Sequence, residues 1–368
     1  MTDTVSLFFD RHVNKGSDRV RKVIFITGSM VRGGAERVIS NLCNYFADAG
    51  WDVCLISCLH PETGYYIDSR IRIADVSAPR RNRLLDLPRL IAALRSIIRN
   101  EQPDAVVSFM YKINIITAVA CKGLRVRFYP SERNDPDHRS WILKKAGEWA
   151  YGQATMAIMQ TTRAKSCFST KVQRKSIVIP NPVSVEEYAT DQKRKEIVTV
   201  GRLEPQKNQK LLIEAFYLFR QTHPDYKLHI FGTGSLEREL KGQVVRLGLQ
   251  DAVEFKGNVE NIHYQIREAA LFVLSSDYEG LSNALLEAMM MGLPCISTDC
   301  LGSDDIIDDG ESGIIVGRGD VYALAAAMHK LIDDQGLAKA YAAEAHRRTV
   351  ARYSAKETCQ QWERVIEA

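Results

Sequence analysis

Runs of apolar residues alternate with amphipathic segments along almost the whole chain. Short runs such as "KVIFIT" (22–27), "DAVVSFM" (104–110) and "ALFVLSS" (270–276) lack in–out alternation, which is typical of parallel strands covered on both faces. Segments such as "GAERVISNLCNYFADAG" and "NQKLLIEAFYLFRQTHP" repeat apolar residues at helical spacing and end at glycine or proline. The pattern therefore predicts an α/β fold built from repeated β–α units.

The β–α rhythm pauses once, near the middle of the chain. "IVIPNPV" (177–183) ends a strand in a Pro-Asn-Pro turn, and "EIVTVGRL" (196–203) starts a second series. A chain of 368 residues is also longer than one core ordinarily supports. We predict two doubly wound domains, 1–183 and 184–345, and a helical segment, 346–368, that returns to the first domain. Two such domains form a cleft, with ligands at the carboxyl ends of the strands.

Composition and cysteine usage are those of an ordinary globular protein. Apolar residues make up 45% of the chain and charged residues 26%, and no apolar run approaches the length of a membrane span. The polar residues 1–20 do not resemble a signal peptide, so we expect no leader. The 8 cysteines are scattered without a C-x-x-C spacing, which favours reduced thiols over metal ligands and indicates a cytoplasmic location.

Charge divides unevenly between the two predicted domains, although the whole chain carries only +4. Residues 1–183 contain 28 Lys and Arg against 16 Asp and Glu, a net charge of +12. Residues 184–368 contain 21 against 29, a net charge of −8. This difference in net charge between the two domains could have no functional significance. Alternatively, the first domain faces something anionic, such as a membrane surface or a phosphorylated acceptor.

A pair of cations follows the first strand of the second domain. In "GRLEPQKNQ", Arg202 comes directly after the strand and Lys207 stands just before the next helix. An arginine fork and a lysine ammonium at a strand's carboxyl end can hold a diphosphate without a metal ion. A basic surface turn is the alternative, because this spacing alone is not specific.

Glycine turns separate strands from helices in both predicted domains. Gly33 and Gly34 precede a helix N-terminus, whose free amides and dipole favour an anion. Their spacing from Gly28 does not give the dinucleotide pattern G-x-G-x-x-G, which argues against a nicotinamide oxidoreductase. The turn in "FKGNV" (255–259) could pair its backbone with a planar base, although an ordinary turn gives the same pattern.

Two carboxylates flank the helix start in "EGLSNALLEAM" (279–289). Glu279 lies on the exit loop of the preceding strand, Ser282 or Asn283 can cap the helix, and Glu287 lies one turn deeper. The pair could bind vicinal hydroxyl groups, with helix-start amides between them, or remain solvated surface charges. Hydrolysis by paired carboxylates is a further alternative, but it would not need the basic pair. A metal site would need a histidine or more carboxylates close by, and this stretch contains neither.

Taken together, these motifs resemble the family 4 retaining glycosyltransferases of the GT-B fold. The resemblance covers the glycine pair, "VGRLEPQKNQKLLIEAF", "IFGTGSLERELK", "FKGNV", "SSDYEGLSNALLEAMMMGLPCISTD" and "DDGESGIIV". It is specific in the second half, where the order and spacing of the motifs agree, and less specific in the first. It implies two Rossmann-like domains facing a deep cleft, the first binding the acceptor and the second the nucleotide sugar.

The resemblance also implies a role for each motif. The catalytic residues would be Arg202 and Lys207, which hold the donor diphosphate and stabilise it as it leaves, and Glu279, which contacts the transferred sugar. Glu287 would bind the ribose hydroxyls. The remaining donor contacts would come from Gly33 and Gly34 at the diphosphate, Asn258 and Val259 at the nucleobase, and the amides of Gly280, Leu281 and Ser282 at the sugar or phosphate.

Two stretches depart from the family pattern. Where many members have a histidine at the end of a first-domain strand, this chain reads "YPSERNDPDH". The acceptor-side candidates there are Glu132, Arg133, Asn134 and the offset His138. In "LGSDDII", Asp305 stands where the family often has a glutamate after a glycine pair. Both departures affect the identity of the sugar more than the class of reaction.

These features predict a hexosyltransferase that moves a hexose or N-acetylhexosamine from a nucleotide sugar to a glycan or polyprenyl-diphosphate-linked acceptor. The expected pathway is cell-surface polysaccharide assembly, of lipopolysaccharide or capsule. A UDP-sugar is favoured over a GDP-sugar, and the resemblance implies retention of anomeric configuration without a metal or cofactor. We expect no nucleic-acid partner. A nucleotide-sugar epimerase or phosphorylase and a nicotinamide oxidoreductase are the alternatives.

An arginine-rich helix could supply contact with a membrane. Residues 79–100 combine leucine and isoleucine at helical spacing with Arg80, Arg81, Arg83, Arg89, Arg95 and Arg99. A surface helix with its apolar face in the core gives the same pattern. Alternatively, the helix docks on an anionic inner leaflet, which would make a cytoplasmic protein peripheral at the inner membrane face.

Overall fold

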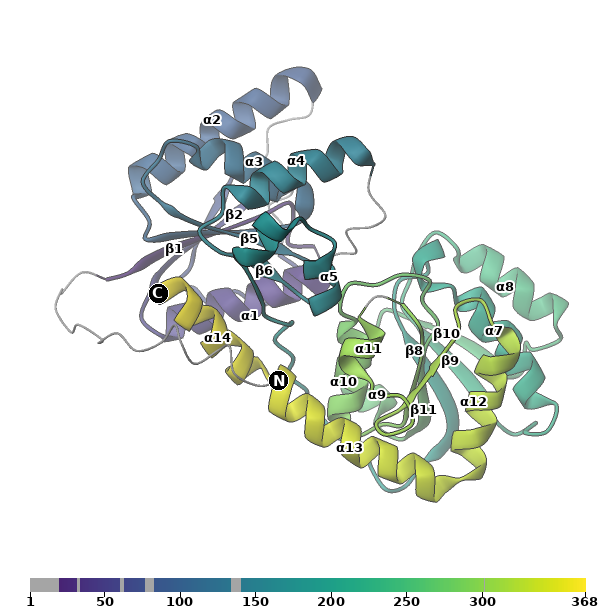
Figure 1. The fold of residues 1–368 in the computed structure, drawn as a ribbon. Helices are drawn as coiled ribbons and strands as arrows, with labels where there is room; N and C mark the ends of the chain where they lie inside the picture. The colour runs from purple at the N-terminus through teal and green to yellow at the C-terminus, as the bar shows by residue number, and fades with distance from the viewer. Residues whose placement is uncertain (1–19, 32–33, 60–62, 77–82, 134–139, 301) are drawn as a thin grey trace.

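The computed structural model describes residues 20–31, 34–59, 63–76, 83–133, 140–300 and 302–368. Strands and helices alternate in both halves of the chain (Figure 1). The first half contains β1 (Lys22–Thr27), α1 (Gly34–Asp48), β2 (Asp52–Ser57), β3 (Arg72–Asp75), α2 (Arg83–Glu101), β4 (Ala105–Phe109), α3 (Tyr111–Cys121), β5 (Arg127–Glu132), α4 (Trp141–Gly152), β6 (Ala157–Met159), α5 (Thr162–Ser166), α6 (Thr170–Arg174) and β7 (Ser176–Val178).

The second half repeats this alternation. It contains β8 (Arg194–Val200), the 3-10 helix η1 (Pro205–Lys207), α7 (Gln209–Arg220), β9 (Lys227–Phe231), α8 (Glu237–Arg246), β10 (Val253–Gly257), α9 (Ile262–Ile266), β11 (Ala269–Leu274), α10 (Asn283–Met291), β12 (Cys295–Thr298), α11 (Ser303–Ile306), β13 (Ile314–Val316) and α12 (Val321–Asp333). The helices α13 (Gln335–Tyr353) and α14 (Ala355–Glu367) follow.

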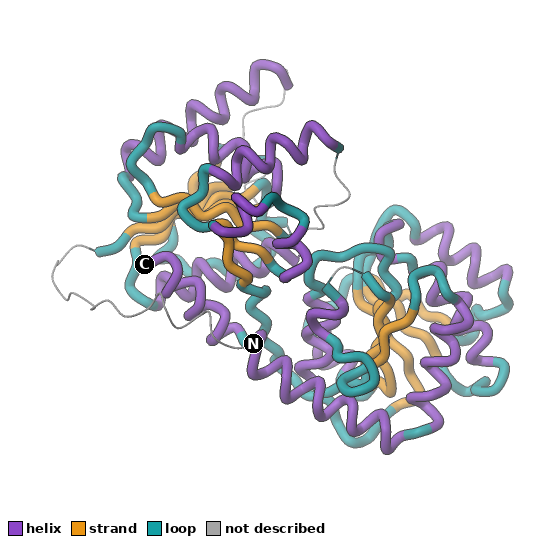
Figure 2. Tube along the Cα trace, in the orientation of Figure 1, coloured by secondary structure: helices purple, strands orange, loops and turns teal. Residues whose placement is uncertain are grey.

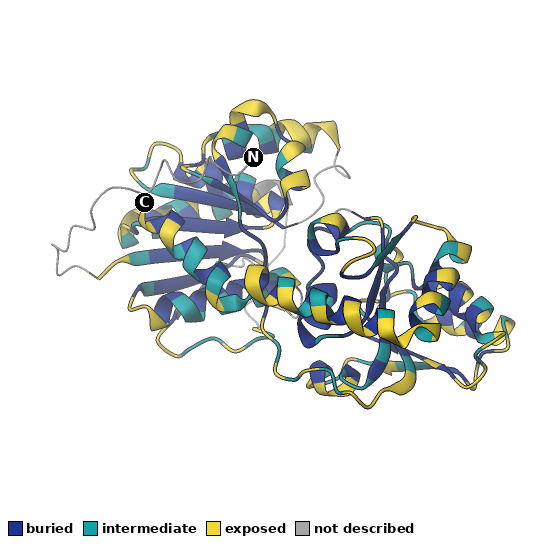
Figure 3. Ribbon diagram, turned by 60° about the horizontal axis from the view of Figure 1, so that its bottom comes forward, coloured by how far each residue is buried: buried dark blue, intermediate teal, exposed yellow. Residues whose placement is uncertain are grey.

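The strands of each half form one parallel sheet. The first sheet has the order β3-β2-β1-β4-β5-β6-β7 and the second β10-β9-β8-β11-β12-β13. The inner strands are buried on both faces, so their sequences read as continuous apolar runs (Figure 3). The predicted α/β architecture of two doubly wound domains is confirmed.

Helices cover both faces of the first sheet (Figure 2). Along β1, Phe25 packs with α1 and α14 on one face, whereas Ile24 and Ile26 pack with α2, α3 and α4 on the other. This division follows from the two-residue alternation of side chains along a strand. Trp362 of α14 is fully buried beside Phe109, so the last helix belongs to the core of the first domain.

The second sheet is sandwiched in the same way. On one face α7, α8 and α12 pack around residues such as Phe216 and Met328. On the other face α10 and α13 pack around residues such as Met289 and Ala345. None of the helices in the described part of the chain is both long enough and apolar enough to cross a lipid bilayer.

The chain crosses between the domains twice, at neighbouring points. Val183 N donates to the backbone O of Tyr353 at 3.0 Å, and Ala355 N donates to the backbone O of Val183 at 2.8 Å. α13 therefore packs on the second domain and α14 on the first, with the crossing at Ser354 between them. The crossing lies beyond residue 346, where the sequence analysis began the returning segment.

Each sheet has a point where the strand order reverses. It lies between β1 and β4 in the first sheet and between β8 and β11 in the second. Ligands of doubly wound sheets bind outside the carboxyl ends of the strands at such a point. The loops after β8 and β11 therefore mark the first place to look for a site in the second domain.

Candidate active site

Lys207 and Glu279 meet at the strand-order reversal of the second sheet. Lys207 ends η1, after β8, and its Nζ forms an ion pair with Glu279 Oε1, from the loop after β11. Ser276 Oγ donates to the same carboxylate oxygen at 2.7 Å, and Gln206 Nε2 donates to the other at 3.3 Å. Glu279 is buried, so its charge is held by fixed donors instead of water.

The loops that carry this pair are bonded to each other. Asn208 Nδ2 donates to Asp277 Oδ1 at 2.8 Å, and Ser275 Oγ donates to the backbone O of Lys207 at 2.9 Å. Asn208 also caps α7 from the left-handed region, at a φ of 43°. These bonds fix the position of Lys207 against the loop after β11.

Arg202 lies in the turn after β8 and is exposed. Its charge acts on Glu36, which lies in the first turn of α1. Burial raises the pKa of Glu36 above its usual value, while its own backbone amide and the Arg202 guanidinium act in the opposite direction. The charge of Arg202, in the second domain, therefore acts on a carboxyl group of the first domain.

Glu287 of α10 is buried and has two side-chain partners. Arg37 Nη1, from α1 of the first domain, donates to Glu287 Oε1 at 2.7 Å. His263 Nε2 lies 3.0 Å from Glu287 Oε2, while the amide of Glu186 donates to His263 Nδ1 at 3.3 Å. Because Nδ1 accepts that bond, Nε2 carries the proton and donates to Glu287. Glu287 is therefore bonded across the interdomain space in this conformation.

The start of α10 faces the start of α1. Ser282 caps α10, its side chain accepting from Leu285 N at 3.4 Å. Asn283 Nδ2 donates to the backbone O of Gly34 at 3.2 Å. A Cβ built on Gly34 would lie 3.3 Å from Asn283 Nδ2, so a larger residue would push the two helix starts apart. The two helix N-termini are thereby held close together.

Gly280 and Leu281 lie against the first domain, where Gln160 is one of their contacts. Leu281 N donates to Gln160 Oε1 at 3.2 Å, so this amide already has a partner in the described conformation. A Cβ built on Gly280 would overlap Gln160 Oε1. Only glycine permits this close approach.

Asn258 and Val259 follow β10 at the same edge of the second sheet. Asn258 is exposed, and its Nδ2 donates to Thr233 Oγ1 at 3.1 Å, in the loop after β9. Val259 is partly buried against the core beneath α10. The loops after β8, β9, β10 and β11 thus gather at one edge.

Glu132 and Arg133 are buried at the end of β5. Tyr151 Oη donates to Glu132 Oε2 at 2.9 Å, and Arg133 Nη1 donates to Asn181 Oδ1 at 2.8 Å. The Arg133 guanidinium also lies 5.3 Å from the Trp362 ring centroid. Burial lowers the pKa of Arg133 to about 9. Both side chains therefore already have partners inside the first domain.

Asp305 lies on α11, beside the first domain. Burial raises its pKa, and the neighbouring Asp304 acts in the same direction, while the Thr162 amide is among the groups that oppose the shift. Gly33, Asn134 and His138 lie outside the described residues.

Among the residues that contact the predicted ones, the sequence analysis missed Arg37, Gln160 and His263. Arg37 lies three residues after Gly34, so its place in the first turn of the predicted helix was the available signal. Gln160 ends the apolar run 154–160 and His263 stands in the helical segment 261–269, and neither pattern indicates a binding role. The contact of Gln160 depends on how the two domains face each other, and that of His263 on how α9 packs beside α10.

Relatives with names in glycan assembly align along most of the chain. The "GalNAc-α-(1→4)-GalNAc-α-(1→3)-diNAcBac-PP-undecaprenol α-1,4-N-acetyl-D-galactosaminyltransferase" of Campylobacter jejuni is 26% identical, covering 86% of this chain and 90% of that protein. The "Amylovoran biosynthesis glycosyltransferase AmsD" of Erwinia amylovora is 26% identical, covering 87% and 92%. Such relatives are glycosyltransferases of polysaccharide and lipopolysaccharide biosynthesis.

Comparisons with solved structures and with family models agree with these sequence relatives. Anabaena HepE, solved "in complex with UDP and glucose", superposes with a TM-score of 0.81 over 94% of this chain and 99% of that one, at 19% identity. Residues 32–187 match the model of Glycosyltransferase Family 4, and residues 182–348 match that of Glycosyl transferases group 1. Because the two models together extend over both domains, the chain belongs to the family 4 type of glycosyltransferases with the GT-B fold.

Proposed function

We propose that this protein transfers a hexose or an N-acetylhexosamine from a nucleotide sugar to a glycan or lipid-linked glycan, with retention of the anomeric configuration. The observation that carries the proposal is the ion pair of Lys207 and Glu279 where the order of the second sheet reverses. A buried carboxylate suited to hydroxyl groups and a cation suited to a diphosphate lie there in direct contact. Arg202, which follows the same strand β8, supplies a second, exposed cation.

In the proposed reaction the bond between the anomeric carbon and the donor diphosphate breaks, and the acceptor hydroxyl oxygen bonds to that carbon on the same face of the sugar. The hydroxyl proton passes to the departing diphosphate. Negative charge develops on the diphosphate as it leaves. Lys207 and Arg202 stabilise that charge because they are already positioned before the reaction begins. Glu287 holds the ribose hydroxyls and Glu279 those of the moving sugar, and no metal ion takes part in the transfer.

A UDP-sugar is the favoured donor, and a GDP-sugar is the alternative. UDP and glucose are bound by the Anabaena protein of the same fold, which supports the first choice. The Campylobacter relative is named for an undecaprenol-linked glycan, which supports a lipid-linked acceptor. Assembly of a cell-surface polysaccharide is the proposed pathway.

We also propose that the first domain contacts an anionic lipid surface through α2 and α4, which both pack against α3. On α4, Trp141 is 68% and Ile142 61% exposed, and Lys145 Nζ lies 5.2 Å from the Trp141 ring centroid. Exposed tryptophan beside lysine is suited to the boundary between lipid and water.

Some arginines of α2 are exposed, and one is hydrogen-bonded to a neighbouring helix. Arg89 and Arg99 are exposed, whereas Arg95 Nη1 donates to the backbone O of Ala120 at 2.8 Å. Arg95 is thus bonded to the end of α3 and is not among the proposed lipid contacts. Arg80 and Arg81 lie outside the described residues.

The donor proposal is tested by binding. UDP, GDP and a panel of UDP- and GDP-sugars would be titrated into the protein by calorimetry, with and without EDTA. We expect UDP-sugars to bind in both conditions and the GDP compounds to bind at least about tenfold more weakly. Binding to none of the nucleotides, or binding only when a divalent metal is supplied, would contradict the proposal.

A further inference from the structure

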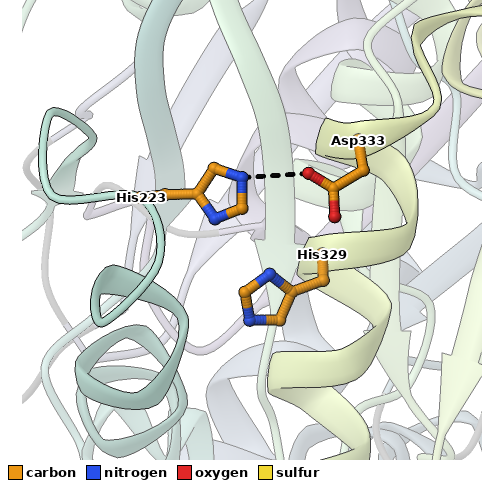
Figure 4. Close-up of side chains that lie close together, drawn as sticks. All are labelled: His223, His329 and Asp333. Carbon is orange, nitrogen blue, oxygen red and sulfur yellow. Dashed lines mark hydrogen bonds and ion pairs between the residues drawn. The ribbon is translucent and has the colours of Figure 1, made fainter.

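Two histidines and an aspartate converge on the surface of the second domain, at a distance from the candidate active site. His223 follows α7, and His329 and Asp333 lie on α12 (Figure 4). Each offers one ligand atom, and these atoms all lie within 4.8 Å of one another. His223 Nε2 is 2.9 Å from Asp333 Oδ1.

The fold itself brings these side chains together. His329 and Asp333 are one turn apart on α12 and therefore project from the same face. α7 packs along α12, and the turn after α7 presents His223 to that face. The His223 ring stacks on Phe219, with ring centroids 4.5 Å apart and planes 3° apart, and the His329 centroid is 5.0 Å from Phe219. One buried ring thus orients both imidazoles.

His223 has a side-chain partner at each ring nitrogen. Thr222 Oγ1 lies 3.0 Å from Nδ1, and Asp333 Oδ1 lies 2.9 Å from Nε2. In the tautomer that carries its proton on Nδ1, which donates to Thr222 Oγ1, the Nε2 lone pair faces the Asp333 carboxylate. A cation between these two acceptors, either a proton or a metal ion, satisfies both.

The third ligand favours a metal ion over a proton. A proton would satisfy only His223 and Asp333, whereas the His329 imidazole lies beside the same carboxylate. Two imidazoles and one carboxylate are ligands that Zn²⁺ binds at about 2.0–2.2 Å in a tetrahedral arrangement. Small rotations of side chains already within 4.8 Å of one another would complete such a site, with water as the fourth ligand.

We propose that His223, His329 and Asp333 form a binding site for a divalent transition-metal ion, with Zn²⁺ as the expected occupant. The site lies at the opposite edge of the sheet from the candidate active site, because α7 begins next to Lys207 and runs back to the start of β9. The ion is therefore structural. It joins the end of α7 to the end of α12, directly before α13 leads back toward the first domain.

This proposal is independent of the proposed sugar transfer, in which no metal ion takes part. An ion that binds only the folded protein stabilises it by mass action. Occupying the site would raise the melting temperature without changing the transfer chemistry. Its test therefore uses binding and stability as readouts.

The test starts from protein freed of metal with a chelator and then dialysed. Zn²⁺ would be titrated in by calorimetry, and Co²⁺ would be followed by its visible absorption, which reports tetrahedral coordination. We expect one ion per chain, a tetrahedral Co²⁺ spectrum and a higher melting temperature with Zn²⁺. His329→Gln and Asp333→Asn should each weaken the affinity at least about tenfold, since even the loss of a residue that only supports a ligand costs about 10–100-fold.

His346→Gln is the matched control, because His346 Nδ1 contacts the backbone O of Met290 and lies outside the cluster. It should bind Zn²⁺ as the unaltered protein does. Circular dichroism would show that each variant is folded before titration. Absence of a stoichiometric site, or equal binding by the unaltered protein and folded His329→Gln and Asp333→Asn variants, would overturn the proposal. The cluster would then be a hydrogen-bonded acid–imidazole pair with a nearby histidine.

Discussion

Arg37 of the first domain donates to Glu287 of the second, with Nη1 2.7 Å from Oε1. Glu287 is the residue proposed to bind the ribose of the donor. In the described conformation one of its oxygens is therefore held by the opposite domain, and the other by His263. If Glu287 binds the ribose as proposed, donor binding requires it to exchange the guanidinium for ribose hydroxyls.

Removing Arg37 should strengthen nucleotide binding. Arg37→Ala frees Glu287 from its competitor, and we expect the Kd for UDP to fall by about twofold to tenfold, because the binding-competent state becomes more populated. Glu287→Gln should instead raise the Kd by about tenfold to a hundredfold, since hydrogen bonds to charged groups contribute about 1.5–3 kcal/mol. Calorimetric titration of both variants checks this. If Arg37→Ala weakened UDP binding as Glu287→Gln does, Arg37 would be a donor ligand and not a competitor.

Replacing Glu36 should make the protein more stable, increasingly so as the pH rises. The pKa of Glu36 is raised in the folded state above its ordinary value of 4.5, so folding favours the protonated form. The contribution of Glu36 to folding stability is fully present below pH 4.5, the ordinary pKa of the side chain. It is lost as the pH rises through the folded-state pKa. Glu36→Gln removes this dependence, so the melting temperature of the variant relative to the unaltered protein should rise between about pH 4 and 8.

Arg202→Ala provides the complementary measurement. It removes a charge that opposes the shift, so the pKa of Glu36 should rise further. The stability gained from Glu36→Gln in that background should then increase at neutral pH. A pH-independent difference between Glu36→Gln and the unaltered protein would show that Glu36 has an ordinary pKa.

Membrane contact should depend on the exposed end of α4. The double change Trp141→Ser and Ile142→Ser removes apolar surface without touching the core, and we expect affinity for vesicles containing phosphatidylglycerol to fall about tenfold. Flotation of vesicles on a density gradient measures the bound fraction. Tyr322→Ser is the matched control, because Tyr322 is 79% exposed but lies on the second domain. Equal flotation of both variants, or binding insensitive to salt and to anionic lipid, would remove the membrane proposal.

Much of the fold was predictable because buried parallel strands leave continuous apolar runs. The same geometry explains why residues as distant as Lys207 and Glu279 could be assigned to one edge, since parallel strands bring their carboxyl ends together. Their direct contact was not predictable. The sequence analysis assigned Lys207 to the donor diphosphate and Glu279 to the transferred sugar, whereas in the structure the two side chains form an ion pair with each other.

Contacts between the domains were beyond the reach of sequence patterns. Arg37 and Gln160 acquire their partners only when two separately folded sheets face each other. His263 meets Glu287 within the second domain, where α9 packs beside α10. The cluster of His223, His329 and Asp333 shows the same limit. The helical spacing of His329 and Asp333 could be read from the sequence, but the approach of His223 depends on how α7 packs against α12.

The account rests most directly on Lys207 as the cation that stabilises the leaving diphosphate. The decisive measurement is the rate of nucleotide release from the preferred UDP-sugar, with and without acceptor, for Lys207→Ala and the unaltered protein. Lys210→Ala is the control, because Lys210 is an exposed residue of α7 that forms an ion pair with Glu239 of α8. We predict that Lys207→Ala lowers kcat by about a hundredfold to a thousandfold and Lys210→Ala leaves it unchanged. Full turnover by folded Lys207→Ala would contradict the account.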